Sequence, residues 1–421
     1  MKYIISLLLL TASVFAIAGE DAELIRLQQL IKEHHLPFTV GPTSVSDLTL
    51  REVTGLKVPE HFNAAPRALP PPPMTALPAR FDWRDQGMVS PVKNQRNCGA
   101  CWAFATVGPM ESGILRAGGS TQDLSEQDLI SCNPWGYSCD GGFWAFDMFV
   151  SPGAVLESCQ TYTASSATLC VNCDHPYALR EWAYVSSDDM PADKDIKTAI
   201  LLYGPVAGAL HASDALMRYR SGVFTLDEAG DINHAVTIVG WDDSMGPNGA
   251  WIIKNSWGTG WGEEGFAYVA YDILQLGYAA AYVLYLPPPG EDAYEPDNTP
   301  AEAKPIAVGE VQHHTSVADP DWVKFHLDPG SVYYVYTDNL CSGSDTIIRL
   351  YDASGATLLA VNDDYHGDVR YSYLQITPTV PTDYTLMVDQ VFGYGPDLQY
   401  NLGLEFLRYT LSSPTRRSTP H

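Results

Sequence analysis

The spacing of hydrophobic and polar positions changes along the chain, and each spacing predicts a different element. Between Glu20 and His35, apolar residues recur every three to four positions with charges between them: Leu24, Leu27, Leu30 and Ile31. This is the pattern of an amphipathic helix. The run "WAFATVGPMESGIL" after Cys101 predicts a second helix, one that accommodates Pro109.

The last third of the chain has a different pattern. Four runs rich in β-branched and aromatic residues are separated by Gly, Asp and Asn turns: "DWVKFHL", "SVYYVYT", "TIIRLYD" and "YTLMVDQ". Short strands with turn signals between them predict an antiparallel β-sandwich over 295–406. Residues 407–421 have no apolar periodicity and are expected to be disordered.

Two proline-rich segments divide the chain. "PRALPPPPMTALP" closes the region 19–76, and "LPPPGEDAYEPDNTP" contains a linker at 287–294. Both should be extended and exposed, because proline lacks a backbone donor and disfavours helix before it. The first could be a cleavage site or an interdomain spacer. Seven of the eight cysteines lie between the two, so 77–286 is expected to be a compact unit. The 421 residues exceed the roughly 250–300 that one core supports, so two folded units are expected.

The first residues, "MKYIISLLLLTASVFAIA", place Lys2 before an apolar run and small residues at Ala16 and Ala18. This is the arrangement of a secretory signal peptide, 1–18, cleaved after Ala18. An uncleaved membrane anchor is less favoured because the apolar run is short beside the ~20 residues that span a bilayer. No later segment is both long enough and apolar enough to cross a bilayer. We expect a secreted protein, extracellular or periplasmic, with oxidised cysteines.

Charge narrows the set of partners. The formal net charge is −26, which disfavours phosphate backbones and anionic membrane surfaces. Nucleic-acid binding is therefore not expected. A self-repelling molecule of this kind is expected to be a monomer.

The stretch "NQRNCGACWAF" contains a C-x-x-C pair, Cys98 and Cys101. Such a pair can be a redox dithiol, half of a zinc site, or a nucleophile beside a structural cysteine. A cysteine at a helix N-terminus has a lowered pKa, because the helix dipole favours the thiolate. The run C-G-A-C-W fits the local signature of papain and cathepsins, which requires His and Asn downstream. "NHAVTIVGW" supplies His234, 133 residues after Cys101, and "KNSWGTGWG" supplies Asn255, 154 residues after it.

With "LSEQDLISC" and "CDGG" also in order, about half of the chain resembles the papain-like cysteine peptidases. The resemblance implies an α+β, two-lobed fold over 77–286, with a helical lobe and a β-barrel lobe. It implies that Cys101 attacks the scissile carbonyl, that His234 protonates the leaving amine and that Asn255 orients His234. Gln95 would bind the oxyanion with the Cys101 backbone N–H. Trp257 would shield the His–Asn contact from water, a supporting role.

The same resemblance implies a substrate cleft. Gly141 and Gly142 would leave backbone free to pair with an extended peptide. The pocket for the residue two before the cleaved bond would be lined by Phe143, Trp144, Ala209, Ile232 and Ala235. The small Ala209 leaves room for a bulky apolar or aromatic side chain. Ordinary core packing is the alternative role for Phe143 and Trp144.

Two departures from the family pattern are informative. Asn233 stands where many relatives have Asp before the catalytic His, which leaves the pH profile open. The stretch between Cys132 and Cys139 is too short for the loop that blocks the cleft of dipeptide-removing relatives, so an endopeptidase is expected.

The resemblance implies disulfides Cys98–Cys139 and Cys132–Cys170, which leaves Cys101 as the free thiol. Cys159 and Cys173 could form a third bridge, but the sequence does not fix this pairing. Cys341 is expected to be buried and reduced.

The flanking regions also carry resemblances. Residues 19–76 look like a shortened pro-segment that inhibits the zymogen by lying in the cleft against the substrate direction. Residues 295–406 resemble the bacterial pre-peptidase C-terminal domain, which implies help in secretion or surface binding, and removal by cleavage. No cofactor or catalytic metal is expected, although carboxylates in this acidic domain are candidate Ca²⁺ ligands: Asp319, Asp321, Asp363 and Asp364.

The expected activity is that of a secreted cysteine endopeptidase acting on proteins or peptides through an acyl-enzyme. A disulfide oxidoreductase using Cys98 and Cys101, and a catalytically silent adhesion or carbohydrate-binding relative, are the competing hypotheses. The remaining histidines without a partner motif are expected at the surface or in linkers: His34, His35, His61, His313 and His314.

Overall fold

The computed structural model describes residues 22–60, 77–117, 119–285, 292–315, 320–338, 340, 344–363, 371–391 and 398–407. Several sequence predictions fall outside these residues: the signal peptide, the proline-rich segment with His61, most of the linker, the tail, Cys341, Asp319 and Asp364. Within the described part, no helix is both long enough and apolar enough to cross a membrane.

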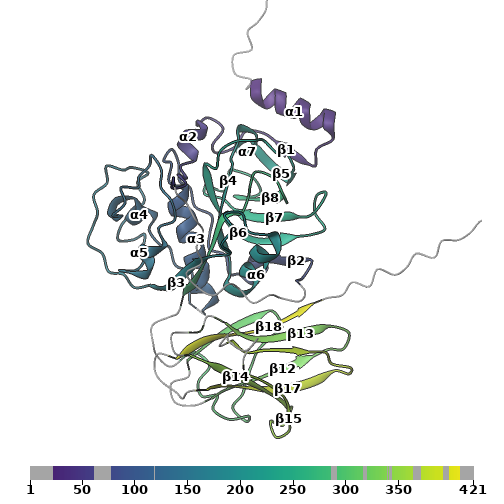
Figure 1. Cartoon of the computed structure of the whole chain (residues 1–421). Coiled ribbons are helices and arrows are strands. Elements are labelled where there is room, and N and C mark those ends of the chain that lie inside the picture. The colour runs from purple at the N-terminus through teal and green to yellow at the C-terminus, as the bar shows by residue number, and fades with distance from the viewer. Residues whose placement is uncertain are drawn as a thin grey trace, which may run out of the picture.

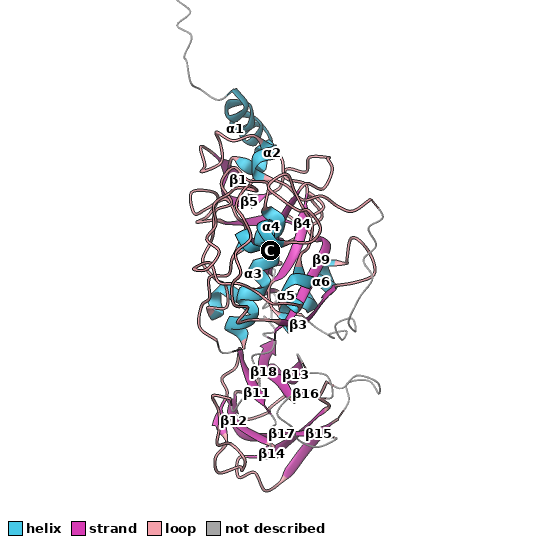
Figure 2. Ribbon diagram, turned by 90° about the vertical axis from the view of Figure 1, so that its left-hand side faces the viewer, coloured by secondary structure: helices cyan, strands magenta, loops and turns pink. Residues whose placement is uncertain are grey.

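The N-terminal segment forms α1 (Ala22–His34), β1 (Phe38–Val40) and α2 (Leu50–Val53). The amphipathic helix predicted over 20–35 is confirmed by α1, in which Leu27 is buried. Strand β1 pairs with β5 (Tyr219–Phe224), so this segment is attached to the main body through backbone hydrogen bonds. Figures 1 and 2 show α1 at one end of the molecule and the strands of the C-terminal unit at the other.

Residues 77–285 form two lobes. One contains α3 (Cys101–Arg116), α4 (Glu126–Cys132) and α5 (Phe146–Val150). Helix α3 begins at Cys101 as predicted and contains Pro109. It is buried almost throughout, because the helices and neighbouring loops pack their apolar side chains around it.

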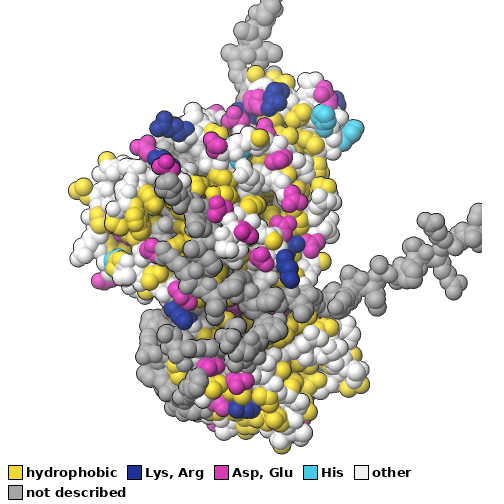
Figure 3. All heavy atoms as spheres, viewed as in Figure 1, with side chains coloured by type: hydrophobic (Ala, Val, Ile, Leu, Met, Phe, Trp, Pro, Cys, Tyr) yellow, Lys and Arg dark blue, Asp and Glu magenta, His cyan; other side chains and the backbone are white. Residues whose placement is uncertain are grey.

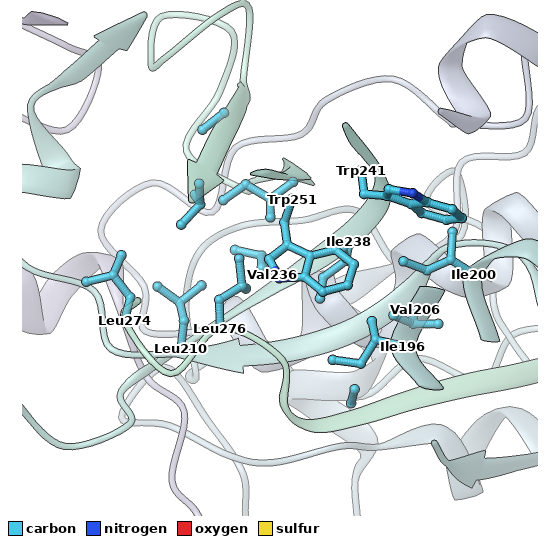
Figure 4. Close-up of a cluster of buried hydrophobic side chains, with 14 of the residues drawn as sticks. Ile196, Ile200, Val206, Leu210, Val236, Ile238, Trp241, Trp251, Leu274 and Leu276 are labelled. Carbon is cyan, nitrogen blue, oxygen red and sulfur yellow. The ribbon is translucent and has the colours of Figure 1, made fainter. Parts of the chain in front are cut away.

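The other lobe is built on a nine-stranded sheet with the order β1-β5-β8-β7-β6-β4-β9-β3, and β2 on β6. Its remaining strands are β2 (Arg80–Asp82), β3 (Leu179–Tyr184), β4 (Val206–Leu210), β6 (His234–Asp242), β7 (Ala250–Lys254), β8 (Phe266–Ala270) and β9 (Tyr278–Tyr285). The short helices η1 (Trp83–Gln86), α6 (Asp193–Tyr203) and α7 (Asp214–Met217) accompany it. Side chains of α6 and of β4, β6 and β7 interlock in its core (Figure 4).

The described residues of the C-terminal unit, between 292 and 407, form two sheets. One has the order β10-β12-β17-β14-β15, with β10 (Lys304–Pro305), β12 (Asp321–Leu327), β17 (Thr382–Gln390), β14 (Thr346–Asp352) and β15 (Leu358–Asn362). The other has the order β11-β18-β13-β16, with β11 (Glu310–Thr315), β18 (Gln399–Leu407), β13 (Val332–Asp338) and β16 (Tyr373–Ile376). Both sheets contribute to one apolar cluster. The four predicted strands are confirmed as β12, β13, β14 and β17.

The expectation that His313 and His314 lie at the surface or in a linker is wrong. Both are in β11, where they are 5% and 0% exposed. His314 is stacked between the rings of Tyr294 and Tyr400. Pairing with β18 covers the strand, and no hydrophobic alternation in "EVQHHT" signals this burial. His34 and His35 are exposed as expected.

Acidic side chains are spread over both parts of the molecule on the face seen in Figure 3.

Candidate active site

The functional side chains converge where the helical lobe meets the sheet. Cys101 is the first residue of α3, and this helix packs on β6. His234 is the first residue of β6, and Asn255 directly follows β7. Because β6 and β7 are antiparallel neighbours, residues 21 apart in sequence come together at one end of the sheet.

The imidazole of His234 is held on two sides. Its Nε2 lies 2.9 Å from Asn255 Oδ1, and the Trp257 ring stacks on it with centroids 4.7 Å apart. Trp257 is itself fixed, because its Nε1 donates to the Val53 carbonyl over 2.8 Å. Among the described residues, His234 Nδ1 has no hydrogen-bond partner. This second nitrogen is therefore available to another group.

Backbone N–H groups near the Cys101 thiol, chiefly those of Ala235, Trp102 and Leu56, oppose the rise in its pKa. Ala235 is the neighbour of His234, so the thiol and the imidazole belong to one site. Both side chains are fully buried. Burial raises the pKa of Cys101 to about 12, and it lowers the pKa of His234 to about 4 against the effect of the Asn255 hydrogen bond. In this conformation, desolvation favours a neutral thiol and a neutral imidazole over the ion pair.

Gln95 is rigidly placed beside this site. Its Oε1 accepts from the Ser256 hydroxyl over 2.6 Å, which fixes the orientation of the amide. Its Nε2 donates to the carbonyls of Val53, at 3.0 Å, and Cys98, at 2.9 Å. The amide N–H therefore points at a carbonyl oxygen of the N-terminal segment.

Residues 53–57 lie across the site. Gly55 N and Leu56 N donate to the Asn233 carbonyl over 3.0 and 2.9 Å, and Leu56 forms a parallel bridge with Gly142. Two hydrogen bonds form this bridge: Gly142 N donates to Gly55 O over 2.9 Å, and Lys57 N donates to Gly142 O over 2.8 Å. A Cβ on Gly55 would lie 1.9 Å from the Gly99 oxygen, so only glycine permits this approach.

The residues predicted to line the substrate pocket are brought together. Phe143, Trp144, Ala209 and Ala235 belong to one buried cluster that also contains Leu56, and Ile232 packs against it. Ala209 and Ala235 face each other across β4 and β6. Gly141 and Gly142 lie beside the N-terminal segment, where a Cβ on Gly141 would be 2.6 Å from the Gly55 oxygen. Leu56 thus belongs to the same buried apolar cluster as these side chains.

The Asn233 side chain has a structural partner. Its Oδ1 accepts from Ala212 N over 2.8 Å and its Nδ2 donates to Ala212 O over 3.0 Å. An Asp carboxylate could accept the first bond but could not donate the second. An amide at this position therefore fixes the chain that follows β4.

Behind Asn255 lies a buried ionic cluster that the sequence reasoning missed. Lys254 Nζ donates to Ser90 Oγ over 2.8 Å, and Ser90 Oγ donates to Glu111 over 2.5 Å. Lys93 lies 2.8 Å from Glu111 and 3.0 Å from Glu126. Burial raises the pKa of Glu126 to about 8 and lowers that of Lys254 to about 8. The sequence feature that could have indicated this cluster is a charged residue inside an apolar motif, such as Lys254 in "WIIKN".

The cysteines separate into two kinds. Disulfides join Cys98 to Cys139, Cys132 to Cys170, and Cys159 to Cys173. Among the described residues, Cys101 is the free cysteine. Because Cys98 is bonded to Cys139, it is not the redox partner of Cys101 in this structure.

Comparison with known proteins gives consistent results. The model of the "Papain family cysteine protease" family matches residues 77–284. Ananain from Ananas comosus is 32% identical over 56% of this chain and 70% of its own. The thiol protease aleurain from Arabidopsis thaliana is 34% identical over 60% of this chain and 72% of its own.

Solved structures of precursors also match. The digestive procathepsin L2 proteinase from the Tenebrio molitor larval midgut aligns with a TM-score of 0.56 at 29% identity, over 62% of this chain and 88% of that one. The recombinant stem bromelain precursor aligns with a TM-score of 0.53 at 28% identity, over the same shares of the two chains.

Proposed function

The chain belongs to the papain family of cysteine proteases and is therefore a peptide-bond hydrolase, and from this premise we propose a secreted cysteine endopeptidase made as a zymogen. The observation that carries the mechanism is the His234–Asn255 hydrogen bond, which leaves the second imidazole nitrogen free beside Cys101. Papain-family peptidases need no cofactor for catalysis.

In the proposed reaction, Cys101 attacks the scissile carbonyl as a thiolate, while protonated His234 gives its Nδ1 proton to the leaving amine. Water then hydrolyses the thioester, with neutral His234 as the base. Gln95 Nε2 and the Cys101 backbone N–H donate to the oxyanion. Asn255 accepts from His234 Nε2 and holds the ring in the orientation that the transfer requires.

Residues 19–76 are proposed to be the inhibitory pro-segment. The Val53 carbonyl accepts from Gln95 Nε2, so it occupies a donor that the oxyanion would need. The parallel bridge between Leu56 and Gly142 supports a chain direction opposite to that of a substrate. The segment also buries Cys101 and His234, and this burial favours their unreactive neutral forms. Removal of the segment would admit water and allow the ion pair to form.

The substrate preference is proposed from the apolar cluster that contains Leu56. Ala209 and Ala235 are small side chains in the same cluster as Phe143 and Trp144, and the Trp144 indole is fixed by its Nε1 hydrogen bond to Ala279 O, at 3.0 Å. A leucine or aromatic side chain two residues before the cleaved bond would bury similar apolar area. A charged side chain there would be left unpaired.

A fluorogenic peptide with Leu or Phe before Arg tests this proposal on the trimmed enzyme. Cleavage should be blocked by a thiol-directed epoxide and be absent in Cys101→Ala. A matched peptide with Asp in place of Leu should be cleaved at least about 100-fold less efficiently, the cost of an unpaired charge in such a pocket. Cleavage that persists in Cys101→Ala would exclude the mechanism. Disulfide reduction that survives His234→Ala would instead support the redox hypothesis.

Residues 295–406 are proposed to be a β-sandwich domain related to the bacterial pre-peptidase C-terminal domain, in a secreted, monomeric protein with an N-terminal signal peptide. The shared core of its two sheets supports the sandwich. A structural Ca²⁺ is proposed at Glu295, Asp297 and Asp321, whose carboxylates lie within 4.8 Å of one another, because hard oxygen ligands suit this ion. Asp363 is exposed and is the weaker candidate. Calorimetric titration of the full chain with CaCl₂ tests the site, and no heat would exclude it.

A further inference from the structure

Strand β13 of the C-terminal unit is buried on both faces. Tyr333 and Val335 point into the cluster shared by the two C-terminal sheets. Tyr336, on the opposite face, belongs with Val311 of β11 to the cluster of the nine-stranded sheet, and Tyr373 of β16 packs against that cluster. A surface strand of an antiparallel sheet ordinarily buries one face only. The second face therefore has a partner, the peptidase unit.

The two sheets of the C-terminal unit are placed accordingly. In Figures 1 and 2, β13 and β18 lie next to the peptidase unit, whereas β14, β15 and β17 lie on the far side. The four-stranded sheet is thus the docking face.

Arg116, the last residue of α3, is at the centre of this contact and is only 4% exposed. Its Nη2 donates to Leu202 O over 2.7 Å, and its guanidinium carbon lies 5.0 Å from the centroid of the Trp83 ring. Among the described residues, the ion pair that it forms is with Asp338 of β13, at 3.6 Å. A buried guanidinium is costly without a carboxylate partner. The C-terminal unit supplies that partner.

On the docking face, the Tyr336 ring packs over Gly403. A Cβ on Gly403 of β18 would be 2.4 Å from Cζ of Tyr336, so the tyrosine ring lies across the glycine. The Tyr336 hydroxyl donates to Glu405 over 3.1 Å. At the edge, the side chain of Tyr371 lies near that of Tyr203, the last residue of α6.

We propose that the C-terminal domain is a non-covalently docked part of the folded peptidase, seated on the end of α3 through Arg116, Asp338 and Tyr336. Cutting the connecting chain then does not release it. This differs from the removable module that the family resemblance implies. The inference concerns association of the two units and does not depend on peptide hydrolysis.

The test uses the full-length Cys101→Ser chain with a site for a sequence-specific protease placed in the linker at 287–290. After cutting, size-exclusion chromatography and sedimentation measure whether the two fragments travel together at pH 7.5 and moderate salt. We expect one species containing both fragments. Fragments that separate completely at micromolar concentration would overturn the proposal.

Variants locate the contact. Asp338→Asn should raise the dissociation constant of the cut fragments at least about tenfold, because Arg116 loses its charged partner. Tyr336→Ser removes apolar contact on the same face and should also weaken association. Arg349→Met breaks the 2.8 Å pair with Asp389 inside the C-terminal unit and should leave association unchanged.

Arg116→Glu with Asp338→Arg should restore part of the association lost in Arg116→Glu alone, which guards against simple misfolding of one variant. Equal dissociation constants for the parent, Asp338→Asn and Tyr336→Ser chains would place the contact elsewhere and refute the proposed interface.

Discussion

Gly55→Ala should weaken the block that residues 53–57 are proposed to form over the active site. The new Cβ would lie 1.9 Å from Gly99 O and 2.4 Å from the Gly99 carbonyl carbon. The obstacle is backbone that cannot easily retreat, since Gly99 N donates to Cys139 O over 2.9 Å and the adjacent Cys98 is disulfide-bonded to Cys139. The segment must therefore move away from the cleft.

This movement disrupts the four backbone hydrogen bonds that join residues 55–57 to Asn233 and Gly142. At about 0.5–1.5 kcal/mol each, their loss weakens the closed state by about 2–6 kcal/mol. The population of open zymogen should rise at least ~30-fold, because 1.4 kcal/mol corresponds to tenfold.

The assay is the rate of Cys101 alkylation by iodoacetamide in uncut protein. A His234→Ala background prevents self-cleavage and is common to all chains compared. Gly41→Ala is the matched control within the same segment, because its Cβ would meet only the flexible Arg220 side chain, at 3.3 Å. Equal alkylation rates in the Gly55→Ala and parent chains would refute the assignment of residues 53–57 as the block.

Three further predictions concern catalysis and stability. Gln95→Ala should lower kcat ~10²–10³-fold with little change in KM, measured on the trimmed enzyme; an unchanged kcat would remove Gln95 from the oxyanion site. Lys254→Met should lower the free energy of unfolding, measured in urea, by about 3–5 kcal/mol, because buried carboxylates lose a counter-charge. The control Arg26→Met removes an exposed ion pair and should lower it by less than about 1 kcal/mol. Replacing Cys159 and Cys173 together by Ser should cost about 3 kcal/mol for a closed loop of this length, and an unchanged unfolding midpoint would contradict it.

Local patterns were sufficient for the elements they specify directly. The helical spacing around Leu27 and the alternation in the four C-terminal runs depend on neighbours a few positions away, so α1, β12, β13, β14 and β17 could be predicted. His313 and His314 could not, because their burial depends on β18, which is distant in sequence and lies beside β11 only in the folded chain.

The candidate site divides in the same way. Gln95, Cys101, His234 and Asn255 could be predicted as site residues because they stand in motifs that resemble those of papain-like peptidases and occur in the same order. The pKa shifts of Cys101 and His234 could not be predicted from the sequence. They depend on the burial of Cys101 and His234 in the covered cleft, and no neighbour in sequence reveals that burial.

The sequence by itself determined the chemical groups of this protein, its periodic elements and its division into units. Only the tertiary structure decided that Leu56 joins the buried cluster of Phe143 and Trp144, that Lys254 and Glu111 form one buried network behind Asn255, and that Arg116 receives its counter-charge from Asp338. The physical reason is that burial and charge pairing depend on distance in space. Such contacts join residues far apart in the chain, and no local pattern records them.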